Sequence, residues 1–140
     1  MTKGKYLGLD FGDKRVGIAV SDLDKIIAFP RGFLSYEVLS EFLQQLKTLC
    51  KQEGVTKIII GLPIGMDGSI GEQVTKTYGF GQKLHDALPQ IPVEYFDERL
   101  TTKAAEERLR EQGIKAKHQK GQKDALSAQL ILETYLKTKK

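Results

Sequence analysis

The stretch YLGLDFGDKRVGIAVSD, residues 6–22, predicts how the fold begins and carries the first candidate functional residue. Two apolar runs, residues 6–9 and 16–20, flank a bend that contains Gly12, a pattern typical of a β-hairpin. Asp10 then ends the first strand on the same face as Gly8 and Tyr6. A carboxylate there suits a metal or phosphate site, but an Asp before a tight turn often only caps that turn. Acidic residues elsewhere in the chain decide between the two.

The bulk composition is that of one ordinary globular domain. The chain has 140 residues, 40% hydrophobic and 29% charged, which is enough to bury a core without disulfides. We expect residues 1–137 to form a single domain, followed by a lysine-rich tail at 138–140. The net charge of +4 suits a polyanionic partner, although many proteins with this charge bind no nucleic acid.

The sequence also indicates where the protein works. Cys50 is the only cysteine, so an internal disulfide is excluded and a reducing compartment is expected. No apolar stretch approaches the roughly 20 residues that span a bilayer, and the N-terminus does not resemble a signal peptide. We therefore expect a cytoplasmic protein with no membrane partner.

The remaining elements predict an α/β fold with a mixed five-stranded sheet, an antiparallel meander followed by parallel strands, flanked by helices. Pro30 favours an edge position for the third strand. Ser35 is the expected N-cap of the first helix, and Gly54 ends it. A loop at 63–71 and a basic segment at 114–123 connect later elements. The elements after the hairpin are expected at residues 26–34, 35–54, 56–62, 72–88, 93–98, 103–112 and 124–136, in the order strand, helix, strand, helix, strand, helix, helix.

Three acids lie at the ends of predicted elements: Asp10 after the first strand, Glu98 after the last strand and Asp124 at the start of the last helix. If the first strand is central, these acids converge at one edge of the sheet. Clustered carboxylates repel one another unless a cation lies between them, and hard oxygen ligands suit Mg²⁺ or Mn²⁺. Two such ions can activate water for phosphodiester hydrolysis.

Each acid also has a simpler interpretation. Asp124 alone favours the helix dipole, and Glu98 alone pairs with Arg99 or a lysine. Asp97 points to the opposite face from Glu98 while the strand lasts, and we expect Asp97 to cap the turn that follows.

Four motifs, in order, resemble those of the YqgF family. These ribonuclease H-like proteins are described as Holliday-junction resolvases or as nucleases of precursor 16S ribosomal RNA. The match covers nearly the whole chain and leaves out the lysine-rich tail. The motifs are D-F-G-x-K-R-x-G-x-A-x-S-D at residues 10–22, G-L-P at 61–63 with M-D-G at 66–68 and Gly71, D-E-R-L-T-T at 97–102, and D-A-x-S-A-x-L-I-L at 124–132.

The resemblance implies a ribonuclease H-like fold and metal-dependent cleavage of a phosphodiester backbone. It assigns the catalytic and metal-binding roles to Asp10, Glu98 and Asp124. Asp13 departs from the expected pattern, and its role is left open. Basic residues near the acids are the expected phosphate contacts, with solvated surface charge as the alternative. They are Lys14, Arg15, Arg99, Lys120 and Lys123.

Three classes of function follow. The first is an endonuclease that acts on structured RNA or branched DNA, in particular one that processes the 5′ end of precursor 16S rRNA or resolves Holliday junctions. The second is a non-catalytic nucleic-acid-binding module. The third is an ATP-binding protein, disfavoured because such folds need two similar domains. A two-fold dimer would suit a four-way junction, whereas this sequence slightly favours a monomer and RNA.

Overall fold

A mixed sheet of five strands organises the protein, with strand order β3-β2-β1-β4-β5. The computed structural model describes residues 4–101, 107, 111 and 122–138. Strands β1, β2 and β3 form an antiparallel meander, whereas β4 and β5 run parallel to β1. The predicted mixed sheet is therefore confirmed, with β1 at its centre. The strands are β1 (Lys5–Phe11), β2 (Arg15–Ser21), β3 (Ala28–Ser35), β4 (Val55–Leu62) and β5 (Val93–Asp97).

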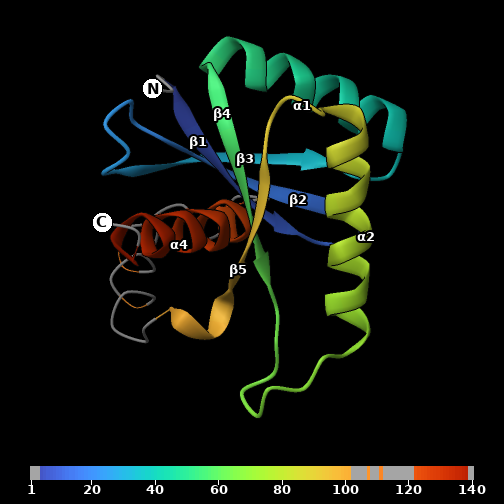
Figure 1. The fold of residues 1–140 in the computed structure, drawn as a ribbon, viewed down its shortest axis with the longest axis vertical. Helices are drawn as coiled ribbons and strands as arrows, with labels where there is room; N and C mark the ends of the chain where they lie inside the picture. The colour runs from blue at the N-terminus through green and yellow to red at the C-terminus, as the bar shows by residue number, and fades with distance from the viewer. Residues whose placement is uncertain (1–3, 102–106, 108–110, 112–121, 139–140) are drawn as a thin grey trace.

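Helices cover both faces of the sheet (Figure 1). Helices α1 (Leu39–Glu53) and α2 (Glu72–Ala87) lie on one face, where Phe42, Leu46 and Phe80 pack against apolar side chains of β1, β2 and β4. Helix α4 (Gln122–Thr138) covers the other face through the buried residues Ile131 and Leu132. Strands that are covered on both faces read as continuous apolar runs, which explains the sequence of β4.

Glycines on the α4 face let this helix lie close to the sheet. A side chain at Gly8 would collide with Leu132 and with the backbone of Ala128. The same face carries Asp10, two residues further along β1. The ring of Phe11 instead stacks on Phe80 with centroids 4.5 Å apart, on the α1–α2 side. The carboxylate of Asp10 is therefore directed toward the α4 face.

Several local predictions were wrong. Ser35 ends β3 and does not cap α1, whose N-cap is Val38 without a side-chain hydrogen bond. Glu98 does not extend β5 but begins a short 3-10 helix, η1 (Glu98–Leu100).

Other local predictions were confirmed. Gly54 ends α1 in the left-handed conformation, with φ of 66°. Cys50 is buried. Most of the predicted helix at 103–112 and of the basic segment at 114–123 lies outside the described residues. Within the described part of the chain, no helix is long and apolar enough to cross a membrane.

Candidate active site at the carboxyl ends of the central strands

Asp10 occupies the centre of the candidate site. It lies near the end of β1 and is paired with Gly17 of β2. Burial raises the pKa of Asp10 to about 6, and the negative charge of Asp124 adds to this effect. A side-chain hydrogen bond with Ser127 acts in the opposite direction and lowers the pKa of Asp10. Ionising Asp10 therefore costs more free energy than ionising an exposed aspartate, and a nearby cation would offset this cost.

Glu98 reaches the same place from η1, which follows the edge strand β5. Burial raises its pKa to about 7, and the charges of Asp10 and Asp97 contribute in that order. A methyl group at Gly61 would lie 3.1 Å from the carboxyl carbon of Glu98. Gly61 of β4 thus leaves the space that this carboxylate occupies.

Asp124 lies in the first turn of α4. The approach requires Gly17, because any side chain at that position would overlap the Asp124 backbone carbonyl. Arg15 places its Nε 3.0 Å from Oδ2 of Asp124. This oxygen is buried and, among the described residues, accepts no hydrogen bond, so the contact with Arg15 is one of charge without hydrogen-bond alignment.

The donor chemistry of these three residues fits a divalent cation. The carboxylates of Asp10 and Glu98 are buried enough to raise their pKa values, and together with Asp124 they are hard oxygen donors of the kind that Mg²⁺ or Mn²⁺ prefers. Asp10 interacts electrostatically with both other acids, since each pair appears among the causes of a raised pKa. As the described residues stand, however, no three acidic, histidine or cysteine side chains are gathered closely enough to hold an ion.

Asp97 takes the structural role expected of it. Its Oδ1 accepts a hydrogen bond of 2.9 Å from the Arg99 backbone and so caps η1. Its carboxylate also accepts bonds from Arg99 Nε and Nη2, the shortest at 2.7 Å. Arg99, predicted to contact phosphate, is thus held by Asp97. A methyl group on Gly68 would come within 3.6 Å of Arg99 Nη1, so the loop at 63–71 lies beside η1.

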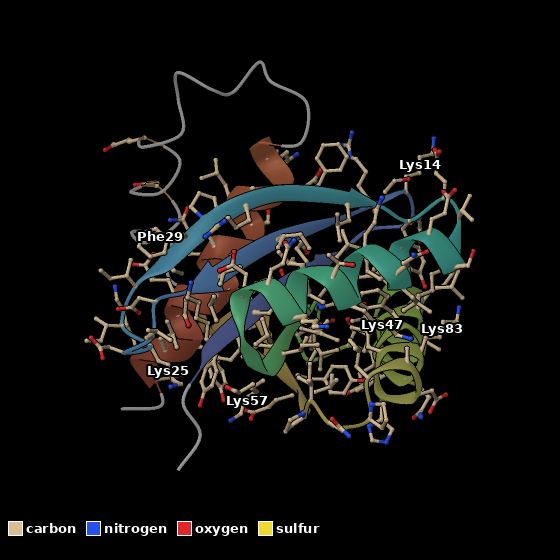
Figure 2. The ribbon with its side chains drawn as sticks, turned by 90° about the horizontal axis from the view of Figure 1, so that it is seen from above. Lys14, Lys25, Phe29, Lys47, Lys57 and Lys83 are labelled. Atoms are coloured by element: carbon tan, nitrogen blue, oxygen red, sulfur yellow. The ribbon has the colours of Figure 1, made fainter. Side chains whose placement is uncertain are left out.

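The other predicted phosphate contacts differ in their surroundings. Lys14 is exposed at the β1–β2 turn, at the opposite end of the molecule from Lys25 and Lys57 (Figure 2). Lys123 is exposed in the first turn of α4, while Lys120 lies outside the described residues. Arg15 contacts Asp124, as described above.

Asp13, the unexpected acid of the first motif, lies beside a lysine of α2. Its side chain is 63% exposed and its Oδ1 lies 3.7 Å from Nζ of Lys76 on α2. This arrangement makes Asp13 a surface ion-pair partner.

Two residues of the site were missed in the sequence. Gly17 and Gly61 shape the spaces for Asp124 and Glu98, although the sequence analysis gave them no role. The available signal was the presence of glycine inside two apolar strands, which often marks close approach of another backbone or ligand.

Comparisons with known proteins find related sequences over nearly the whole chain. Two similar proteins, from Crocosphaera subtropica and Caldanaerobacter subterraneus, are both named "Putative pre-16S rRNA nuclease". The first is 40% identical over 136 residues, covering 97% of this chain and 94% of the relative. The second is 41% identical over 138 residues, covering 97% and 98%.

Solved structures show the same fold at low sequence identity. Thermus thermophilus RuvC in complex with a Holliday junction matches with a TM-score of 0.57 and 14% identity, over 96% of both chains. The Fowlpox virus resolvase, solved with Holliday junction DNA, matches with a TM-score of 0.59 and 8% identity, over 96% of this chain and 97% of the other. The family model described as "RuvX: Holliday junction resolvase" matches residues 4–138. The chain therefore belongs to the RuvX family, the YqgF-type proteins that its motifs resemble.

Proposed function

We propose that this protein is a metal-dependent endonuclease that hydrolyses phosphodiester bonds in structured nucleic acid, with the 5′ end of precursor 16S rRNA as its substrate. The observation that supports the proposal is the electrostatic interaction of Asp10 with both Asp124 and Glu98 near the ends of the central strands. Burial and mutual repulsion make this cluster unfavourable without a cation. The names of the relatives support the choice of RNA.

The roles of the residues follow from their positions. Asp10, Glu98 and Asp124 would hold Mg²⁺ or Mn²⁺, with Asp10 between the other two. Such ions, when bound, polarise the scissile phosphate and activate a water molecule. Lys14 in the β1–β2 turn and Lys123, the residue before Asp124, are exposed and would bind the phosphates on either side of the cut.

A Holliday junction is the second candidate substrate. The description of the family model favours it, as do the two resolvase structures that contain junction DNA. A nuclease of this fold could meet either substrate through the same phosphate contacts, since these contacts carry little sequence information.

Single-turnover cleavage of a precursor 16S 5′ segment and of a synthetic four-way junction, each with Mn²⁺ and with EDTA, tests the proposal. We expect cleavage of the RNA that requires the metal. Cleavage of the four-way junction but not of the RNA would show that the protein acts as a Holliday junction resolvase. Binding of either substrate without cleavage would favour the non-catalytic module.

A further inference from the structure

Arg15 is held between an acid of the site and an aromatic ring. Its Nε lies 3.0 Å from Oδ2 of Asp124, and its guanidinium carbon lies 5.4 Å from the centre of the Phe33 ring. The Arg15 side chain is nevertheless 39% exposed. Arg15 therefore contributes positive charge to the site, and its side chain remains partly exposed to solvent.

The contact with Asp124 has poorer hydrogen-bond geometry than the other arginine–carboxylate pair near the site. Arg99 donates aligned hydrogen bonds to Asp97 from Nε and Nη2, with distances of 2.7 to 3.1 Å. Arg15 makes no aligned hydrogen bond to Oδ2 of Asp124, which is buried and accepts none from the described residues. The Arg99–Asp97 pair is fixed by aligned hydrogen bonds, whereas the Arg15–Asp124 contact is an ionic contact without a defined hydrogen-bond geometry.

We propose that Arg15 is the counter-ion of Asp124 in the metal-free protein and competes with the divalent cation for this carboxylate. The inference rests on the proposed function, because it takes Asp124 as a metal ligand. A guanidinium about 3 Å from a ligand oxygen repels an incoming divalent ion, so binding of the ion requires Arg15 to leave. Its exposed side chain then becomes available to the phosphates of the substrate.

The competition also accounts for the open arrangement of the acids. No three of the described acidic, histidine or cysteine side chains stand ready to hold an ion, although Asp10 interacts with both Glu98 and Asp124. While Arg15 contacts Asp124, this carboxylate is not available as the third ligand of the metal ion. Release of Arg15 is the step that would return this ligand.

Lys14 offers a matched control for Arg15. It is the preceding residue, carries the same charge, is exposed, and forms no ion pair among the described residues. Neutralising Lys14 changes the long-range field of the site as neutralising Arg15 does, but leaves Asp124 engaged. A difference between the two variants therefore measures the direct contact.

Isothermal titration of Mn²⁺ into the nucleic-acid-free protein tests the inference without measuring cleavage. We expect Arg15→Gln to bind Mn²⁺ roughly 1.5- to 5-fold more tightly than wild type, the range for a partly exposed ion pair. Lys14→Gln should gain less Mn²⁺ affinity than Arg15→Gln, because it changes only the long-range field and leaves the contact with Asp124 in place. Arg15→Lys, which keeps the charge, should stay close to wild type, and circular dichroism establishes that each variant is folded.

The outcomes separate this inference from the proposed function. Equal Mn²⁺ affinity of wild type and Arg15→Gln, or weaker binding by Arg15→Gln, would overturn the role of Arg15 and leave the metal site standing. Equal gains in Lys14→Gln and Arg15→Gln would overturn it as well, since the effect would then be long-range. Absence of Mn²⁺ binding in wild type and in Arg15→Gln would overturn both proposals.

Discussion

Replacing Asp10 with Asn is predicted to stabilise the metal-free protein at alkaline pH, although it removes the central acid of the site. Burial and the charge of Asp124 raise the pKa of Asp10 from its ordinary value of 3.8 to about 6. The folded protein thus keeps this proton to a higher pH than the unfolded chain does. Wild-type stability therefore falls as the pH rises from about 4 to about 6, and the full cost applies above that window.

The magnitude follows from the pKa of Asp10. One pKa unit corresponds to about 1.4 kcal/mol, so a rise from 3.8 to about 6 sets an upper limit of about 3 kcal/mol at pH 8. At about pH 4.5 the same linkage gives about 1 kcal/mol. Because Asp10 keeps partial contact with solvent, we expect a gain of about 1–3 kcal/mol at pH 8 for Asp10→Asn.

Urea unfolding in EDTA at about pH 4.5 and pH 8 measures this gain for wild type and Asp10→Asn. Asp13→Asn is the matched control, since its exposed carboxylate undergoes the same chemical change and should alter stability by less than about 0.5 kcal/mol. The reasoning fails if Asp10→Asn is no more stable than wild type at pH 8. It fails equally if the difference does not grow between the two pH values.

Two further substitutions test the architecture around the site. Gly17→Ala should lower the free energy of unfolding by about 1–3 kcal/mol and weaken Mn²⁺ binding, because the new methyl group displaces Asp124. Gly79→Ala, whose methyl group would meet nothing within 4 Å, serves as the control in urea unfolding. An equal loss of stability in both variants would contradict the proposed crowding at Gly17. Tyr135→Phe removes a hydroxyl that donates to Glu94 (3.0 Å) and accepts from Lys57 (3.2 Å), which should cost about 0.5–1.5 kcal/mol in thermal unfolding. Cleavage by Tyr135→Phe should match wild type, because these residues lie at the opposite end of the sheet, and a large loss of activity would show that the site extends further than we propose.

Much of the fold could be predicted from residue patterns because the decisive signals are local. Alternation in residues 6–20 and the apolar run of β4 each report how a strand is covered. The left-handed Gly54 marks the end of α1 without reference to the rest of the protein. The prediction that Ser35 caps α1 failed because β3 continues to this residue. Pairing of Ser35 with Arg15 in the sheet outweighs the preference of serine for a helix N-cap.

The three acids of the candidate site were proposed from the sequence, whereas the arginine contacts around them could not be predicted. The positions of Asp10, Glu98 and Asp124 at element ends indicate convergence, since carboxyl ends of parallel strands share one edge of the sheet. Which carboxylate a nearby arginine contacts depends on tertiary distances that no spacing encodes. Arg99 is held by Asp97, and Arg15 contacts Asp124, whereas the sequence suggested phosphate contacts for both.

The central claim is that Asp10, Glu98 and Asp124 form the metal-binding site of an endonuclease that cleaves RNA. One series of cleavage measurements tests this claim most directly. Mn²⁺-dependent cleavage of a precursor 16S 5′ segment should be measured for wild type, Asp10→Asn, Glu98→Gln, Asp124→Asn and the control Asp13→Asn. Loss of groups that only orient metal ligands costs 10- to 100-fold, so each of the three site variants should lose about a hundredfold or more, while Asp13→Asn stays near wild type. Cleavage by Asp10→Asn at the wild-type rate would contradict the account.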